Sequence, residues 1–139
     1  MLDPAIYLKE IHYLAVVTAT IAGFLLGALW YATPLFGNAW MKELGLKKED
    51  ISGPLVPMIV TIILTLIIAF SLEVLIIGLD ITSVQGAALL GLLVGIFFMA
   101  TNMLSDYLYN GWSKKLFLIQ AGYRVVMLIV MAAILNLWR

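Results

Sequence analysis

A few polar side chains interrupt long apolar stretches of this sequence, and these are the residues whose chemistry could matter. An Arg or Asp at the centre of a membrane-spanning helix costs about 2.5–3.5 kcal/mol, so such groups usually have partners and mark proton, ion or solute paths. They can equally hold helices together by hydrogen bonds, each worth about 0.6–2 kcal/mol. The candidates are His12, Glu73, Asn102, Asp106, Gln120, Arg124 and Asn136.

One group of candidate residues lies near the same end of the expected membrane-spanning helices. Glu73 lies about 7–8 Å from the end of its helix, at 1.5 Å per residue. His12 begins one helix and Asn136 nearly ends another on the same side, where Gln85 also falls. We therefore expect Glu73 to face the interior and to contact the first or last helix near His12 or Asn136, where it could carry a proton.

The second group lies toward the opposite end. Arg124 is about 12 Å from that end and at the level of Asn102, with Asp106 just beyond. Gln120 lies one turn from Arg124 on the same helix face. Because Glu73 and Arg124 differ in depth by roughly 10–15 Å, we do not expect them to pair. Asp106 or Asn102 is the expected partner of Arg124.

Enzyme chemistry has little support in the sequence. Cys is absent, which excludes disulfides, thiolate catalysis and cysteine metal sites. His12 is the only histidine, so a haem held by two histidines of one chain is impossible. No nucleophile, base and orienting group stand at a recognisable spacing. We predict no catalytic residue, no metal site and no cofactor.

The composition indicates that lipid is the solvent. Apolar residues make up 64% of the 139 residues and charged residues 12%, against about 45–50% and about 25% in soluble domains. The mean hydropathy is +1.10. Eight basic residues balance eight acidic ones, so there is no basic surface of the kind that binds nucleic acid.

Four apolar stretches are long enough to cross a membrane, which takes about 20 residues. They predict helices over about 12–31, 55–78, 84–104 and 116–138, in a single transmembrane domain of residues 1–139. The first stretch is longer than the apolar region of a cleavable signal peptide, and no A-x-A cleavage site follows it. We expect it to be retained as a helix.

The connections predict a turn, an interfacial segment and membrane anchors. Gly78 suits a left-handed helix end, and Thr82 with Gln85 suits a capping box, so the second and third helices should be antiparallel neighbours. The first connection, residues 32–54, contains a short amphipathic segment that suits the membrane surface; an ordinary polar loop is the alternative. The expected interface anchors are Trp30, Tyr31, Trp40 and Trp112.

Small residues recur every four positions on two of the expected helices. Such rows let helices approach closely in lipid. Whether the rows pack within one chain or between chains stays open. The residues are Ala15, Ala19, Gly23 and Gly27 on the first helix and Ala87, Gly91 and Gly95 on the third.

Lysine and arginine near the helix ends predict the orientation, because they concentrate on the cytoplasmic side. The first and third connections carry five lysines, and the opposite side carries only Lys9 and Arg139. This bias favours both termini outside the cell. The five lysines are Lys42, Lys47, Lys48, Lys114 and Lys115.

The segment GALWYATPLFGNAW, residues 27–40, resembles the signature of a bacterial membrane family known as domain of unknown function 1761. The matching positions include Trp30, Tyr31, Pro34, Gly37 and Trp40. The GYR segment at 122–124, with AIL at 133–135 and a later Trp, is similar to that family's last helix. Ala-Thr precedes the proline here, where the family usually has a single Ser. The resemblance implies four helices and no particular activity.

The sequence as a whole predicts an all-α integral membrane four-helix bundle with a short interfacial segment between its first two helices. We expect it in the bacterial cytoplasmic membrane, in contact with membrane lipids and not with nucleic acid. Its function is predicted to be structural or accessory, as a homo-oligomer or a subunit of a larger complex. The alternative is a small transporter or channel that uses the polar residues for proton, ion or solute passage. A polar cavity joining the two polar groups would favour transport, and dry packing would favour the accessory role.

Overall fold

The computed structural model describes residues 3–50 and 54–139. All of its regular elements in these ranges are helical, as predicted. Residues 51–53, which belong to the first connection, lie outside the described residues. In chain order the elements are α1 (Pro4–Glu10), α2 (Tyr13–Trp30), η1 (Thr33–Gly37), α3 (Asn38–Leu44), η2 (Lys48–Asp50), α4 (Leu55–Gly78), α5 (Val84–Leu93), η3 (Val94–Ala100), α6 (Thr101–Asn110) and α7 (Lys114–Leu137).

Four helices are long and apolar enough to span a membrane, in agreement with the predicted number. They are α2, α4, α7 and one continuous helix of 27 residues, Val84–Asn110, formed by α5, η3 and α6. This third span runs past the predicted end at 104 because the helix stops only at Gly111, whose φ of 67° is left-handed. The last helix begins at Lys114 because the Ser113 side chain accepts a hydrogen bond from Leu116 N and caps it.

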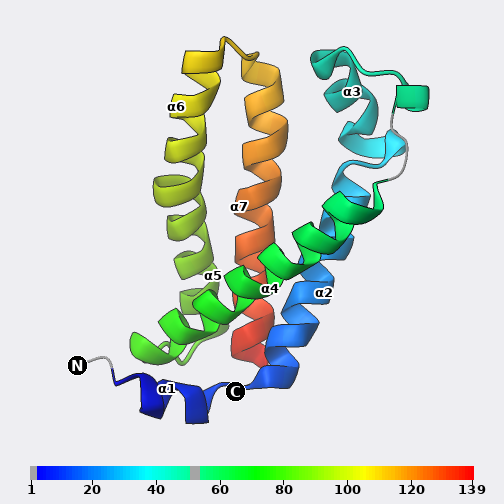
Figure 1. The fold of residues 1–139 in the computed structure, drawn as a ribbon. Helices are drawn as coiled ribbons and strands as arrows, with labels where there is room; N and C mark the ends of the chain where they lie inside the picture. Colours follow the sequence, from blue (N-terminus) through cyan, green and yellow to red (C-terminus); the bar gives the residue numbers. More distant parts are fainter. Residues whose placement is uncertain (1–2, 51–53) are drawn as a thin grey trace.

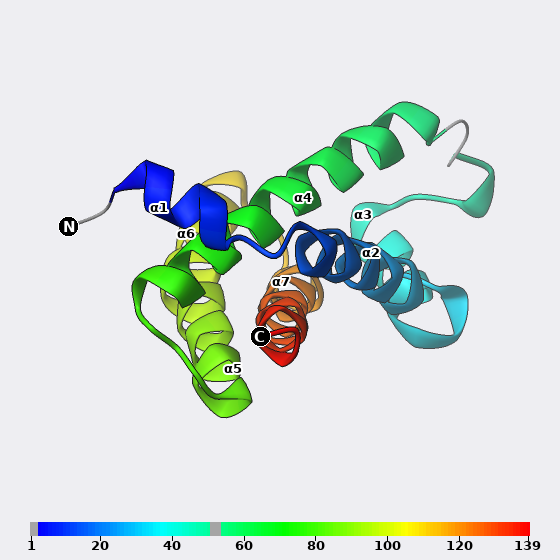
Figure 2. The same cartoon turned by 90° about the horizontal axis from the view of Figure 1, so that it is seen from below.

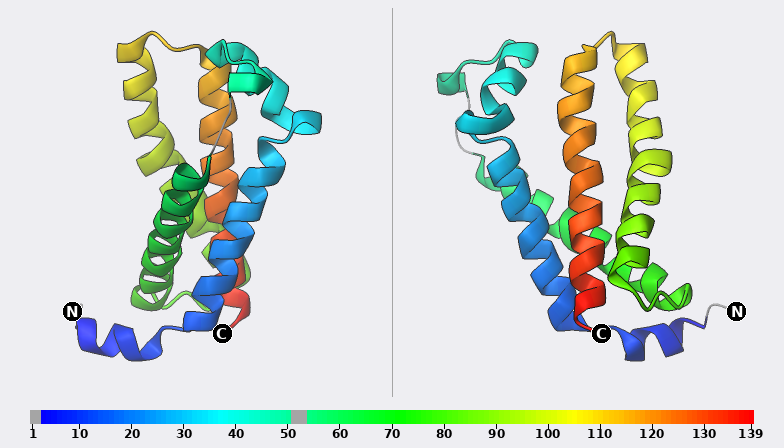
Figure 3. Two further views of the ribbon diagram at one scale, coloured as in Figure 1. Left: turned by 45° about the vertical axis from the view of Figure 1, so that its right-hand side comes forward. Right: turned by 180° about the vertical axis from the view of Figure 1, so that it is seen from behind.

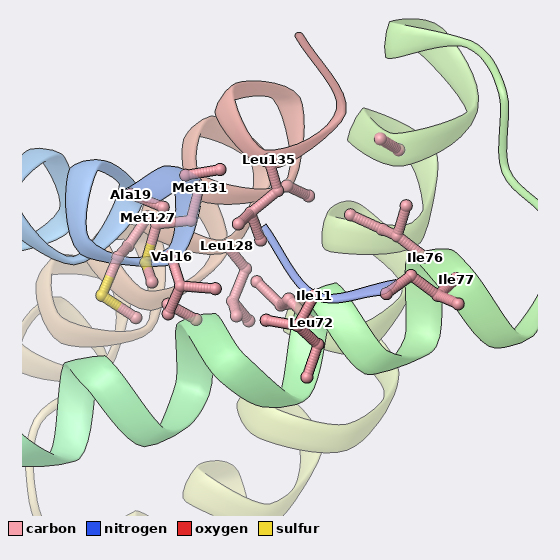
Figure 4. Close-up of a cluster of buried hydrophobic side chains, with 14 of the residues drawn as sticks. Ile11, Val16, Ala19, Leu72, Ile76, Ile77, Met127, Leu128, Met131 and Leu135 are labelled. Carbon is pink, nitrogen blue, oxygen red and sulfur yellow. The ribbon is translucent and has the colours of Figure 1, made fainter. Parts of the chain in front are cut away.

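Helix α7 occupies the centre of the molecule. The right panel of Figure 3 shows α7 between α2 on one side and the α5–α6 helix on the other, and α4 crosses these helices obliquely (Figure 1). The buried core lies along α7, where Met127, Leu128, Met131 and Leu135 meet α2 and α4 (Figure 4). Contacts with α7 therefore hold the other spans together.

The second and third spans are not the packed pair that their short connection predicted. After the turn, α5 packs along α7, and α4 and α5 meet only near their joined ends. The turn also uses other residues than expected. Asp80, with φ 52°, has the left-handed conformation instead of Gly78. Ser83, instead of Thr82, caps α5 by accepting a hydrogen bond from Gly86 N at 3.0 Å.

Both rows of small residues pack within the chain. Ala15 and Ala19 on α2 have no exposed surface. A Cβ atom placed on Gly23 would lie 2.8 Å from Met131 Sδ, and one on Gly27 would lie 2.7 Å from the Tyr123 hydroxyl, both on α7. In this way α2 reaches close contact with α7.

The row on α5 makes the tightest contact with α7. Ala87 is fully buried. A Cβ atom on Gly91 would lie 2.5 Å from the carbonyl oxygen of Leu128, and one on Gly95 would lie 3.0 Å from Val125 Cα. Backbone meets backbone here, so no side-chain movement can make room.

Two short helices lie at opposite ends of the molecule. The sequence analysis did not predict α1, which Asp3 caps by accepting a hydrogen bond from Ala5 N at 3.0 Å. It lies across the end that carries both termini, against α4 (Figure 2). At the other end, η1 and α3 form the short segment predicted between the first two spans.

The close contact at Gly91 predicts a large effect of a single methyl group. Gly91→Ala should lower the free energy of unfolding by about 1–3 kcal/mol, because overpacking forces α5 away from α7. Thermal unfolding in detergent measures this. Leu89→Ala on the same helix is the control, since Leu89 is 54% exposed and its truncation should change stability much less. Equal effects of the two changes would contradict the packing described here.

Candidate functional site

Asn102 and Asp106, the predicted partners of Arg124, do not line the groove in which Arg124 lies. Asn102 and Asp106 are exposed on α6, whereas Arg124 faces a groove on the other side of α7, toward α2 and α4. No ion pair or hydrogen bond joins Arg124 to either residue in the described part of the chain. The predicted level was also wrong: Gly95 packs against Val125, so Asn102 lies about two turns nearer the connection to α7 than Arg124 does.

The groove that Arg124 lines has a volume of about 510 Å³. It is bordered by α2, the short helix α3, the first turns of α4 and the middle of α7. Its walls are mostly apolar. The lining residues are Phe24, Gly27, Ala28, Tyr31, Trp40, Pro57, Met58, Thr61, Gln120, Tyr123 and Arg124.

The polar groups of the groove are mainly hydrogen-bond donors. Arg124 supplies a guanidinium, whose central carbon lies 5.5 Å from the centroid of the Tyr123 ring. The indole N–H of Trp40 is buried and has no hydrogen-bond partner among the described residues. Burial raises the pKa of Tyr31 to about 12, and the charge of Arg124 opposes this effect. The Tyr31 hydroxyl therefore keeps its proton at neutral pH.

Gln120 is the one predicted polar residue that the structure brings together with Arg124. Its side-chain oxygen accepts a hydrogen bond from the Tyr107 hydroxyl on α6. The amide nitrogen of Gln120 stays available as a donor, because an amide carries both functions. Gln120 and Arg124 thus share one groove, as their spacing of one helical turn predicted.

Side-chain hydrogen bonds to carbonyl groups fix the two helices that form the groove wall. The Tyr123 hydroxyl donates to the carbonyl of Gly23 at 3.0 Å. The Trp30 indole donates to the carbonyl of Ile119 at 2.9 Å. Gly27 is required beside them, because any Cβ there would occupy the place of the Tyr123 hydroxyl. Trp30, predicted as a membrane anchor, thus joins α2 to α7.

The bend at residues 31–40 carries Trp40 back over the groove. Pro34 begins the wide turn η1, and Leu35 has non-helical backbone angles of φ −106° and ψ −108°. Gly37 closes the turn, where a Cβ would lie only 2.4 Å from the Tyr31 carbonyl oxygen. The Tyr31 and Trp40 rings then meet edge to face at 5.5 Å. The tryptophan predicted to lie at the membrane surface therefore lines the groove.

The short helix α3 is also held in place by a hydrogen bond. The Ser113 hydroxyl, at the start of α7, donates to the Glu43 carboxylate at 2.6 Å. The first and third connections are therefore joined at this end of the molecule. Trp112, which is 51% exposed, packs against Tyr107 with ring centroids 5.0 Å apart; its role as a membrane anchor stays a prediction.

At the opposite end, Glu73 faces the interior as expected and has no exposed surface. One carboxylate oxygen accepts a hydrogen bond from the backbone N–H of His12 at 3.3 Å, and the other is buried without a partner among the described residues. The acceptor lies at the start of α2, where the helix dipole is positive. His12 contributes its backbone, while its side chain is exposed.

Asn136 has a similar role on the last helix. It is buried, and its side-chain amide donates to the carbonyl of Ile81 at 3.0 Å. This bond ties the end of α7 to the turn between α4 and α5. Gln85 is exposed on α5 and does not join Glu73 and Asn136 in the interior.

Apolar packing separates the Glu73 region from the groove. Along α4, the residues between Thr61 and Glu73 that face inward include Ala69, which has no exposed surface. Along α7, Met127 and Met131 are also fully buried beyond Arg124. The lining of the groove reaches Thr61 on α4 and Arg124 on α7 and includes neither Glu73 nor Asn136.

Several groove residues carried no signal in the sequence that marks a site. Pro57 and Met58 belong to an apolar run, and only tertiary packing brings them opposite α7. Tyr123 appeared only within the GYR segment that resembled a known family. An aromatic residue beside an intramembrane arginine was the available clue.

Comparison with known proteins places the chain in a family. The model of a family described as "Protein of unknown function (DUF1761)" matches residues 14–136. The chain belongs to this family. No curated protein and no solved structure matches it.

The match confirms the family that the GALWYATPLFGNAW segment indicated. Every groove residue lies within the matched range, whereas His12 and α1 precede it. The DUF1761 description assigns no activity. Four apolar helices and this family together identify a membrane protein of unknown function.

The contact between Glu73 and His12 predicts different effects of two substitutions. Glu73→Ala leaves a buried N–H without its acceptor and should lower the free energy of unfolding by about 1–3 kcal/mol. Glu73→Gln should lose less, because its amide oxygen still accepts the hydrogen bond. Thermal unfolding in detergent compares the two. A Gln variant as unstable as the Ala variant would show that the hydrogen bond is not what Glu73 contributes.

Proposed function

We propose that the chain is a complex-forming membrane subunit without catalytic activity, and that α6 binds a second copy of the chain. The observation that carries this proposal is an exposed polar stripe on a membrane-spanning helix. Phe98, Asn102, Asp106 and Tyr109 lie on one face of the third span and are all exposed.

The depth of Asn102 makes this exposure costly in lipid. The helix of 27 residues is about 40 Å long and would extend about 5 Å beyond each side of a hydrocarbon layer of about 30 Å. Asn102 would then lie about 7 Å inside that layer. An amide in hydrocarbon without a hydrogen-bond partner costs several kcal/mol. A protein partner at this level removes that cost.

Neighbouring polar side chains on α6 behave differently from Asn102. Thr101 donates to the carbonyl of Phe97 and Asn110 to the carbonyl of Asp106, so both satisfy themselves on their own helix. Asn102 makes no such bond within the described residues. Its amide is both donor and acceptor, so two copies related by a twofold axis can pair through it. Asp106 lies one turn nearer the helix end, where water reaches it.

The transport alternative has weaker support. The dry packing around Ala69, Met127 and Met131 lies between the groove and Glu73. Glu73 and Asn136 are engaged with backbone groups of helix ends and turns. These observations favour a structural role for the polar residues at that end.

Orientation is a further part of the proposal. We place the chain in a bacterial cytoplasmic membrane with both termini outside. The two ends of the chain lie on the same side of the molecule (Figure 1), and the lysine-rich connections lie on the other. Lysine excess marks the cytoplasmic side.

A reporter enzyme fused after Arg139 tests this orientation. An alkaline phosphatase, which needs the oxidising exterior to fold, should be active there, because the positive connections keep their ends in the cytoplasm. A fusion within the connection after Asn110 is the control and should be inactive. The reverse pattern would overturn the orientation without affecting the number of spans.

Substitution of Asn102 tests the proposed complex. The wild type should be a dimer in mild detergent, and Asn102→Leu should raise its dissociation constant about tenfold, by removing an interhelix hydrogen bond. Ser71→Ala is the matched control: Ser71 is also exposed on a span, but its hydroxyl donates to Ile67 of its own helix. Sedimentation equilibrium measures both. A monomeric wild type, or equal dissociation constants for all three proteins, would contradict the proposal.

Cross-linking tests directly whether the face of α6 that carries Asn102 forms the contact between two copies. The chain contains no Cys, so a single introduced Cys reports on its own position. Phe98→Cys lies one turn from Asn102 on the same face and leaves the Asn102 amide intact. Mild oxidation in native membranes should yield a disulfide-linked dimer for Phe98→Cys and not for Ser71→Cys. A larger mass without this cross-link would indicate a partner other than a second copy.

A further inference from the structure

The groove beside Arg124 contains an excess of positive charge and hydrogen-bond donors, and it is independent of the α6 face. No acidic side chain of the described residues lines it. We propose that this groove binds an acidic amphiphile. Its carboxylate or phosphate head would be held by Arg124, and its apolar tail would lie between α2 and α4.

The polar groups of the groove fit an anion better than any other head. A guanidinium binds carboxylate and phosphate oxygens through two parallel N–H donors. The Trp40 side chain lines the groove, while its indole N–H itself is buried. The Tyr31 hydroxyl and the Gln120 amide add further donors on the same lining. A cationic head would meet Arg124 and no acid.

Size and wall chemistry indicate that the ligand carries a tail. The volume of about 510 Å³ is that of a site for a small organic molecule, typically about 300–1,000 Å³, and exceeds what one inorganic anion fills. Phe24 on α2 and Pro57 and Met58 on α4 form apolar walls on both sides of it. An acyl or alkyl chain matches these walls.

The position of the groove suits a molecule that enters from the membrane. Tyr31 follows the last residue of α2, and Trp40 belongs to α3, so this side of the groove lies at the end of a span where lipid head groups are found. Met58 is 43% exposed and Leu25, beside Phe24, is 59% exposed. The tail side of the groove is therefore bordered by surfaces that face lipid.

Binding can be measured by the quenching of tryptophan fluorescence, because Trp40 lines the groove. The full chain in a neutral detergent is titrated with dibromostearate, whose bromine atoms quench nearby indoles. The methyl ester of the same acid is the neutral control, with an identical tail. The acid should bind about tenfold more tightly than the ester, since only the acid can form charge-assisted hydrogen bonds.

Variants assign the binding to the groove. Arg124→Gln should abolish the preference for acid over ester, while Lys115→Gln should retain it, because Lys115 is an exposed cation on the same helix outside the groove. Trp40→Phe should remove most of the quenching that depends on the acid. Met58→Phe narrows the groove without changing charge or adding a tryptophan, and it should weaken binding of both acid and ester. This last variant keeps the test decisive if Arg124→Gln fails to fold.

Some outcomes would overturn the proposal. Equal affinities of the wild type for acid and ester would exclude recognition of the anionic head. A preference that survives Arg124→Gln in a folded protein would place the site elsewhere. Acetate or inorganic phosphate that displaces dibromostearate at its own dissociation constant would identify the ligand as a free anion instead of an amphiphile.

Discussion

Close approach of α7 to its two neighbours is the interaction on which the rest of this structure depends. Lipid is as apolar as the side chains, so burying them provides no driving force for helix association, and van der Waals contact must act in its place. Gly91 brings α5 against the Leu128 carbonyl, and Gly27 makes room for the Tyr123 hydroxyl. The crossing helix α4 then packs against both α2 and α7.

Once the helices are this close, most interior polar side chains satisfy backbone groups of another element. Glu73 accepts from His12 N at the start of α2, and Asn136 donates to the Ile81 carbonyl in a turn. The Tyr123 hydroxyl and the Trp30 indole donate to carbonyls across the contact between α2 and α7. Residues that a transport hypothesis would use for a proton path therefore have structural roles.

The polar groups left over mark where this protein meets other molecules. Arg124 lines a groove of mostly apolar walls, and Asn102 is exposed on α6. These are the two places at which we propose an amphiphilic ligand and a second copy of the chain. The family name describes no activity, and these unsatisfied groups are the physical basis for assigning one.

The sequence by itself determined that the chain is surrounded by lipid, how many helices span the membrane, and where most of these helices begin and end. Uninterrupted apolar stretches are a property of the chain alone, which is why residues 55–78 were predicted to be a helix with the limits that α4 has. The rows that contain Gly23 and Gly91 indicated close packing for the same reason, and the buried side chain of Glu73 was placed correctly by depth.

Only the tertiary structure decided which faces meet. Depth along a helix follows from residue number, but direction around the axis depends on how each helix is rotated against its neighbours. Asn102 was predicted to face Arg124, but it is exposed on α6 while Arg124 lines the groove between α2, α4 and α7, and the packing of Gly95 on Val125 places the two residues at different levels. The groove needed the turn at Pro34 and Gly37 to bring Trp40 back beside Tyr31. Gly37 is needed in that turn because any Cβ there would lie 2.4 Å from the Tyr31 carbonyl oxygen, but the meeting of Trp40 and Arg124 along one groove is a contact in space that no sequence pattern specifies.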